Sequence, residues 1–179
     1  MIYVFADMWL VLVILFGGAC YDMKEHRVPN WWVLSALLCG LGLGLLTAEK
    51  GQEASAVLRY IARLGAVVAV MFPIFILRVM GAGDIKMMAV ITGCLGFPEG
   101  MKAILCGFVI GAVLALVKML IQRTLFKRLN YLTAYFRRLF LTKEIVPYYV
   151  ARRDGNQAVI PFTACLFLGY LWYLTIRMI

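Results

Sequence analysis

The chain alternates between long apolar runs and short polar interruptions. Six apolar runs cover about residues 2–21, 31–48, 56–77, 85–97, 101–121 and 158–177. Most of them approach the roughly 20 residues that a helix needs to cross the hydrocarbon layer. A segment inside a bilayer must satisfy its own backbone hydrogen bonds, which favours helices over isolated strands. We therefore predict an all-α, polytopic membrane protein with six transmembrane helices, forming a single membrane-embedded domain over residues 1–179.

Proline and glycine mark several of the interruptions and contacts. Pro29 cannot continue a helix, and Asn30 behind it is predicted to cap the second helix. Residues 98–100, Pro-Glu-Gly, are predicted to form the turn before the fifth helix. Gly107 and Gly111 lie four residues apart in that helix, a spacing that indicates close packing against a neighbouring helix.

The fourth predicted helix begins at a glycine-rich break, where Gly81 and Gly83 precede it. Each glycine would permit a positive φ or a close backbone approach that a Cβ would block. The helix itself would be only about 20 Å long, shorter than the roughly 30 Å hydrocarbon layer. Irregular backbone at membrane depth must be buried in protein or lie in water. We therefore expect this helix to begin beside a cavity.

Composition and charge agree with a membrane protein. The chain is 64% hydrophobic and 15% charged, against about half and a quarter in soluble domains. A net charge of +9 also suits a nucleic-acid-binding protein. However, 13 of the 18 Lys and Arg residues lie on one side if the segments containing Asp22 and Asp84 face the cytoplasm. The positive-inside rule then places both acids at the cytoplasmic face and both termini outside. We therefore expect a bilayer and no nucleic acid as partner.

The longest stretch between predicted helices, residues 122–157, is basic and amphipathic. Leu, Phe and Tyr alternate there with eight basic residues: Arg123, Lys127, Arg128, Arg137, Arg138, Lys143, Arg152 and Arg153. Such a pattern is typical of a segment that lies on an anionic leaflet. We predict that this segment lies on the cytoplasmic surface between the fifth and sixth helices.

Two acids stand where the hydrocarbon layer should begin. Asp22 ends the first apolar run, Asp84 follows the glycine break, and each is followed two residues later by a lysine, Lys24 or Lys86. Carboxylates at membrane depth are costly and are candidates for function by default. The first helix ends at Asp22 and the fourth begins at Asp84, so both acids reach the same membrane face. The structural alternative for Asp84 is a cap of the fourth helix.

Two carboxylates that meet in a low-dielectric site share one proton, because both cannot ionise easily. One of them can then act as general base on a water while the protonated partner polarises a carbonyl. The single histidine, His26, has no obvious Ser or Cys partner, and one histidine with scattered acids makes a poor metal site. The five cysteines lie in apolar runs and form no CxxC pair. We expect neither a metal nor a cofactor.

Taken together, these motifs resemble the type IV prepilin peptidases, which are GxGD-type aspartyl proteases of the cytoplasmic membrane. The similar elements are Asp22 with Arg27-Val-Pro-Asn30, Gly81-Ala-Gly-Asp84-Ile-Lys86, and Val159-Ile-Pro-Phe162 followed by Gly169. The resemblance implies that Asp22 and Asp84 are the catalytic pair. It implies supporting roles for Gly81, Gly83, Lys86, Pro29 and Asn30. The implied substrate is a prepilin, whose short basic leader ends in glycine before a hydrophobic helix and is removed at the cytoplasmic face.

The chain departs from that family in two places. Larger members carry an N-terminal region with paired CxxC motifs associated with N-methylation, whereas here the first helix leads directly to Asp22. We therefore expect peptidase activity without methyltransferase activity, similar to the short members that serve tight-adherence (Flp-type) pili. In addition, Thr163-Ala164 stands where many members show a further Gly-Pro.

Two alternative functions stay open from the sequence. An archaeal-type preflagellin peptidase would share the same site and differ in its substrate. A proton-coupled membrane carrier would use the two acids as a relay, although carriers usually show internal repeats with paired broken helices. For a basic leader, the acids Glu25, Glu144 and Asp154 are candidate contacts. The sequence does not define the binding site for the rest of the substrate or the oligomeric state.

Overall fold

The structure is a computed structural model, which describes residues 2–25, 27–76, 80–126, 130, 133–134, 137, 141 and 160–178. His26, residues 77–79 and most of the predicted basic segment lie outside the described residues. The described part of the chain forms helices and no strand, which confirms the all-α prediction there. The helices are α1 (Ile2–Glu25), α2 (Asn30–Leu46), α3 (Glu53–Ile76), α4 (Ala82–Leu95), α5 (Phe97–Ile121) and α8 (Phe162–Met178).

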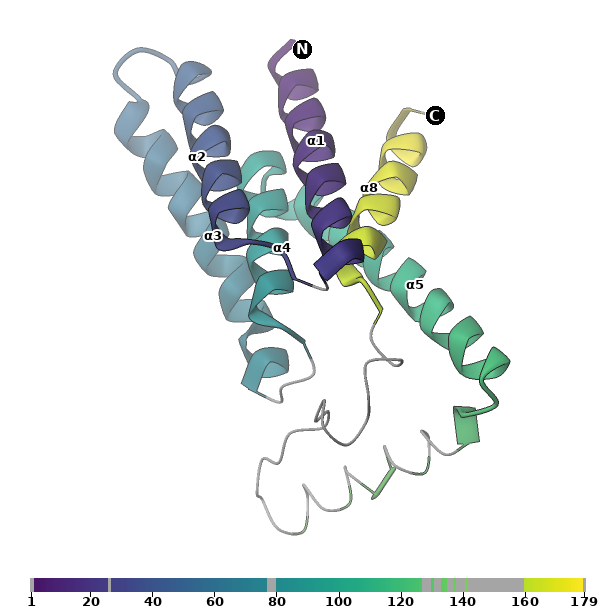
Figure 1. Ribbon diagram of the computed structural model, residues 1–179. Helices are drawn as coiled ribbons and strands as arrows, with labels where there is room; N and C mark the ends of the chain where they lie inside the picture. The colour runs from purple at the N-terminus through teal and green to yellow at the C-terminus, as the bar shows by residue number, and fades with distance from the viewer. Residues whose placement is uncertain are drawn as a thin grey trace.

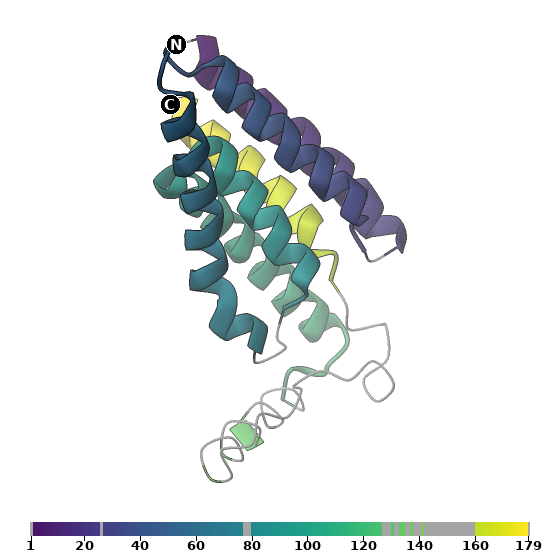
Figure 2. The same ribbon diagram turned by 90° about the vertical axis from the view of Figure 1, so that its left-hand side faces the viewer.

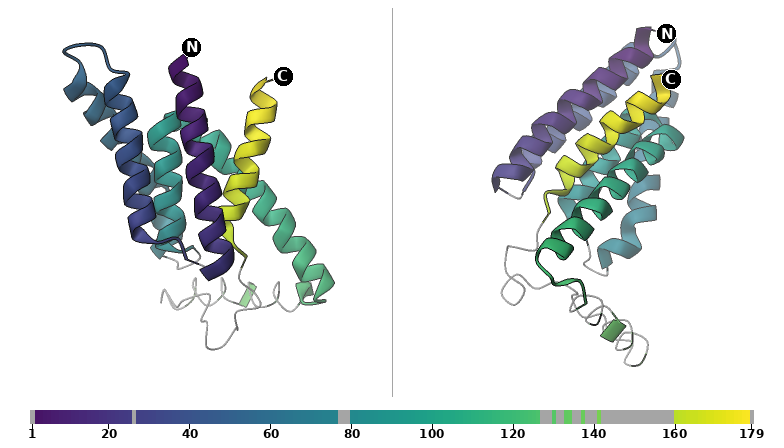
Figure 3. Two further views of the ribbon diagram at one scale, coloured as in Figure 1. Left: turned by 45° about the horizontal axis from the view of Figure 1, so that its top comes forward. Right: turned by 90° about the vertical axis from the view of Figure 1, so that its right-hand side faces the viewer.

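Three of these helices are long and apolar enough to cross a membrane, by length and composition. They contain the candidate spans Ala6–Glu25, Glu53–Ile76 and Phe97–Ile121. The apolar helices Asn30–Leu46 and Phe162–Arg177 are shorter, and α4 has 14 residues. The six-span arrangement therefore stays a prediction. Both ends of the chain lie at one end of the helical bundle (Figures 1 and 3).

Helix α4 lies at the centre of the bundle. It contacts α1, α2, α3, α5 and α8, and Figure 2 shows it between α3 and the pair formed by α1 and α2. All residues from Met87 to Cys94 are buried. A helix that is apolar on all sides is typically buried in this way. Because its neighbours surround it, α4 needs neither a lipid-facing surface nor the full thickness of the bilayer.

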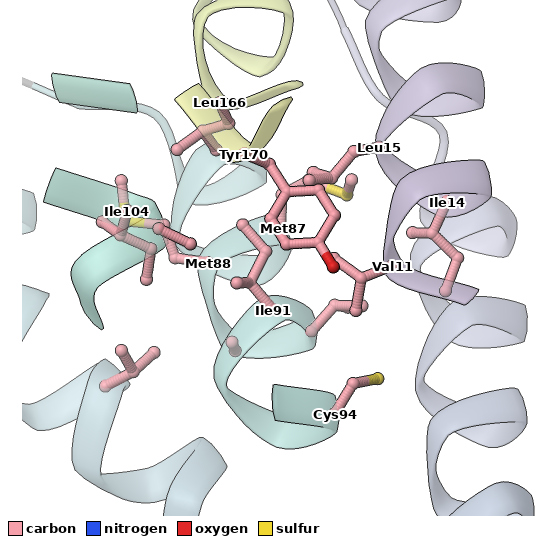
Figure 4. Packing of buried hydrophobic residues seen from close by; sticks show 14 of the residues in the cluster. Val11, Ile14, Leu15, Met87, Met88, Ile91, Cys94, Ile104, Leu166 and Tyr170 are labelled. Carbon is pink, nitrogen blue, oxygen red and sulfur yellow. The ribbon is translucent and has the colours of Figure 1, made fainter. Parts of the chain in front are cut away.

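Tyr170 of α8 fixes the packing of α8 against α1 and α4. Its ring is fully buried and points into the space between Val11 of α1 and Met87 of α4 (Figure 4). Its hydroxyl donates a hydrogen bond to the Met8 carbonyl oxygen at 2.9 Å. Burying the ring stabilises the contact, and the hydrogen bond removes the cost of burying the hydroxyl. This contact holds α8 along α1, so that the start of α8 lies near the end of α1.

Helices α5 and α8 approach each other at backbone contact. An ideal Cβ on Gly169 would lie 2.2 Å from the Gly107 backbone nitrogen, and one on Gly107 would lie 2.8 Å from a methyl carbon of Leu166. Around Gly111 the distances are ordinary, starting at 3.6 Å to Phe162. The predicted close packing is therefore confirmed, and it is tightest at Gly107. Small residues allow this approach because no side chain separates the two helices.

Several helix boundaries differ from the sequence prediction. Asp22 lies inside the last turn of α1 rather than after it, because the helix continues to Glu25. Pro29, and not Asn30, is the N-cap of α2: its backbone is extended, and its carbonyl accepts hydrogen bonds from the N–H groups of Trp32 and Val33. Residues 98–100 form the first turn of α5 instead of a loop. Pro98 fits there because an N–H in the first turn has no helical acceptor.

Candidate active site

A cavity of about 340 Å³ lies where the end of α1 meets the starts of α2, α4 and α8. Figure 1 shows these helix ends at the side of the bundle opposite both termini. Both predicted catalytic acids line the cavity, and the prediction that α4 begins beside a cavity is confirmed. The full lining comprises Asp22, Arg27, Val28, Asn30, Gly81, Ala82, Gly83, Asp84, Lys86, Ile160 and Phe162.

Asp22 is buried at the end of α1 and is bound by the start of α8. Its side chain is 7% exposed, and its Oδ2 atom accepts a hydrogen bond from the Thr163 backbone N–H at 2.8 Å. Thr163 lies in the first turn of α8, where N–H groups have no acceptor within their own helix. The positive end of the helix dipole also favours an anion at this position. The fold therefore supplies Asp22 with an environment that stabilises a carboxylate.

Asp84 lies in the first turn of α4 and is less buried than Asp22. Its Oδ2 atom lies over Gly81, 3.3 Å from the position that a Cβ on that residue would take. The Asp22 and Asp84 carboxylates line the same cavity and are close enough to interact electrostatically. The helix-capping alternative for Asp84 is wrong, because Gly81 is the N-cap of α4 and Asp84 is the third residue of the helix.

Gly81 and Gly83 leave space in two different ways. Gly81 has φ −75° and Gly83 is helical, and neither is among the positive-φ residues of the described chain, so the positive-φ prediction was wrong. A Cβ on Gly81 would press on the Asp84 carboxylate. Apart from its two chain neighbours and the backbone of its own helix, a Cβ on Gly83 would meet no heavy atom within 4 Å, and Gly83 lines the cavity. Gly81 therefore makes room for Asp84, whereas Gly83 leaves room beside it.

Lys86 and Asn30 connect two helix starts beside the carboxylates. The Lys86 Nζ atom donates a hydrogen bond to the Asn30 Oδ1 atom at 3.0 Å, which joins α4 to α2. Both residues line the cavity, whereas Pro29 does not and instead begins α2. Arg27 is the second cation in the lining, so the formal charges of the lining residues balance.

Sequence reasoning missed the backbone N–H of Thr163 as a part of the site. No side-chain pattern could have revealed it, because the donor is an amide found at almost every position. The available signal was Pro161, which marks the start of α8, together with the neighbouring lining residues Ile160 and Phe162. Of the acids suggested for leader contact, Glu25 is exposed at the end of α1. Glu144 and Asp154 lie outside the described residues.

The part of the chain that the structure describes contains no group of three or more His, Cys, Asp and Glu side chains arranged to hold a metal ion. Its five cysteines are free thiols, and none of them lines the cavity. The charged side chains that line the cavity are Asp22, Asp84, Arg27 and Lys86.

A family model described as the type IV leader peptidase family matches residues 9–116. This range covers more than half of the chain and includes both acids and the residues of the cavity up to Lys86. No curated protein and no solved structure matches the chain.

Proposed function

The chain belongs to the type IV leader peptidase family, and on this basis we propose that Asp22 and Asp84 are the catalytic pair of an aspartic endopeptidase. Membership makes the protein a peptidase that acts on prepilin-type substrates. The observation that carries the finer proposal is that both carboxylates line one cavity. Two further observations support it: Asp22 is buried, and Gly83 leaves open space beside Asp84.

The proposed reaction is hydrolysis of the peptide bond between the leader and the mature pilin. Two neighbouring carboxylates share one proton, so one is charged and the other is protonated. The charged carboxylate takes a proton from a water molecule, whose oxygen attacks the scissile carbonyl carbon. The protonated carboxylate donates to the carbonyl oxygen. Collapse of the resulting tetrahedral species breaks the C–N bond and returns each carboxyl group to its starting state.

The membrane orientation is also part of the proposal. The positive-inside rule favours a cytoplasmic cavity in the cytoplasmic membrane. The two termini lie at the opposite end of the bundle (Figure 1) and would then be extracytoplasmic. A reporter enzyme that is active only outside the cytoplasm tests this orientation. Fused to the C-terminus, it should be active. Activity of a cytoplasm-specific reporter at that end would reverse the topology.

The substrate is proposed to be a prepilin of the Flp type, cleaved without N-methylation of the product. Glu25, exposed at the end of α1 three residues after Asp22, is the described candidate for meeting a basic leader, and Glu144 and Asp154 are the further candidates. Neutral replacement of all three should slow cleavage of a basic leader more than cleavage of a leader whose basic residues have been replaced. Equal rates for the two leaders in both the variant and the parent protein would exclude this contact.

The decisive experiment replaces each acid by its amide. Asp22→Asn and Asp84→Asn should each lower leader cleavage by at least about 100-fold, because each removes a proton donor or acceptor that the reaction needs. Cleavage is read as loss of leader mass from a co-expressed prepilin and with detergent-purified protein. Asp7→Asn is the matched control, since Asp7 lies on the same helix but does not line the cavity. Retained processing in both Asp22→Asn and Asp84→Asn would refute the proposal.

A further inference from the structure

The start of α8 distinguishes one of the two proposed catalytic acids from the other. Thr163 is the second residue of α8, and its backbone N–H donates to Asp22 Oδ2 at 2.8 Å. Thr163 is 0% exposed and Asp22 is 7% exposed, so water has little access to this hydrogen bond. The bond also costs the helix nothing, because an amide in the first turn has no helical acceptor.

Two packing contacts between α8 and α1 hold the Thr163–Asp22 hydrogen bond in place. The Thr163 methyl carbon Cγ2 lies 3.1 Å from the position of a Cβ on Gly18, so the start of α8 is seated directly against α1. About two turns further along α8, Tyr170 is bonded to the Met8 carbonyl. Two contacts separated along the same pair of helices fix how far α8 can slide along α1. The Thr163 amide is therefore presented to Asp22 by the fold and not by a flexible loop.

The other charged and titratable groups around Asp22 do not separate the two acids in this way. Asp84 and Lys86 of α4 and Arg27, which precedes α2, line the same cavity as Asp22. On α8 itself, the Cys165 thiol donates a hydrogen bond to the Pro161 carbonyl oxygen at 3.5 Å. The Thr163 N–H, in contrast, is bonded to Asp22.

We infer that the Thr163 backbone N–H is a positioning group that holds Asp22 as the charged carboxylate, which makes Asp22 the general base and Asp84 the proton-carrying acid. This inference rests on the proposed function. A hydrogen bond to a charged form favours that form, and so does the N-terminus of a helix. The shared proton therefore resides on Asp84.

The assignment gives each proton a place. Asp22 takes a proton from the water as the water oxygen bonds to the scissile carbon, and the Asp84 proton passes to the carbonyl oxygen. In the second step Asp22 gives its proton to the departing amine nitrogen as the C–N bond breaks. Asp84 takes back one hydroxyl proton as the new carboxyl group forms, so both residues return to their starting states.

Thr163→Pro tests the inference because proline has no N–H and is tolerated in the first turn of a helix. The matched control is Ala164→Pro, which adds the same ring one residue later and leaves the Thr163 amide intact. We expect Thr163→Pro to lower kcat by about 10- to 100-fold with KM unchanged, the range for losing a hydrogen bond to a charged group. The acidic limb of its kcat–pH profile should move to higher pH, because the charged form of the base has lost a stabilising bond. Ala164→Pro should keep the parent profile.

A second variant keeps the test valid if proline prevents folding. Replacing Thr163 by its α-hydroxy acid converts the amide to an ester, which removes the N–H without adding a ring, and should give the same shift. A parent-like pH profile in either folded Thr163 variant, or an equal shift in Ala164→Pro, would overturn the inference. The proposed function fails separately: it is overturned if Asp22→Asn and Asp84→Asn still cleave. If Asp22→Asn and Asp84→Asn are both inactive while Thr163→Pro behaves like the parent, only the positioning role of the Thr163 N–H is wrong.

Discussion

Gly83→Ala offers the sharpest separation of substrate access from stability. The substitution adds one methyl group next to Asp84 in the chain, at a position where a Cβ meets no heavy atom within 4 Å other than those of its chain neighbours and its own helix backbone. The residue lies in the first turn of α4 and its space belongs to the cavity. If an extended substrate lies against this surface next to the carboxylate, the new methyl group occupies the space that the substrate needs.

We expect Gly83→Ala to leave the stability of the folded state unchanged or slightly higher and to lower the rate of cleavage. Alanine is favoured over glycine within helices by up to about 1 kcal/mol, so the folded state should be unchanged or slightly more stable. Carbon atoms in contact are about 3.5–4.0 Å apart, so a methyl group in the path displaces the substrate by about 1 Å or more. A displacement of that size costs about 100-fold in rate, which corresponds to about 2.7 kcal/mol of transition-state stabilisation.

The assay compares kcat/KM for leader cleavage with the thermal unfolding midpoint in the same detergent. Gly65→Ala is the control, because Gly65 lies within α3, has equally open surroundings and is remote from the cavity lining. We expect Gly83→Ala to lose about 100-fold in kcat/KM while both variants keep or raise the unfolding midpoint. Parent-like cleavage by a folded Gly83→Ala protein would show that the substrate does not pass Gly83. A lowered midpoint would show that the space is not free.

Three further predictions concern the supports of the site. Gly169→Ala should destabilise the protein by at least about 1–3 kcal/mol, because its Cβ would lie 2.2 Å from the Gly107 backbone nitrogen. Thermal unfolding measures this loss. The control Gly44→Ala should leave stability unchanged, because a Cβ on Gly44 would meet no heavy atom within 4 Å other than those of its chain neighbours and its own helix backbone. Gly96→Ala should cost about 1–3 kcal/mol in the same assay, because Gly96 has φ +87° and ψ 160°, a backbone conformation essentially restricted to glycine. An unchanged midpoint would contradict that conformation. Lys86→Met and Asn30→Ala should each weaken cleavage, and the double variant should be no worse than the single ones if they act through their hydrogen bond. Additive losses in the double variant would indicate separate roles.

The two proposed catalytic acids can be recognised in the sequence from their positions. Asp22 and Asp84 are acids at the ends of apolar runs, and such positions are costly enough to signal a function. Gly81 and Gly83 stand out because they form a glycine-rich break between two apolar runs, but the physical role assigned to them was partly wrong. A glycine can be required by a special backbone angle or by missing volume, and the sequence does not separate the two. The structure shows missing volume at the cavity, whereas the positive φ angles of the described residues are at Gly51, Gly96 and Arg123.

By itself the sequence determined the helical class, the two acids and their common face, because hydrophobic period, helix length and the cost of charge are local properties of the chain. Only the tertiary structure decided which groups meet those acids. It placed α4 at the centre of the bundle. The Lys86–Asn30 hydrogen bond joins residues 56 positions apart in the chain, and the Thr163–Asp22 hydrogen bond joins residues 141 positions apart. Such contacts depend on how the helices pack and on the register of α8 along α1, which no local pattern encodes. The Thr163 donor is a backbone amide, so its role exists only where the fold places the start of α8.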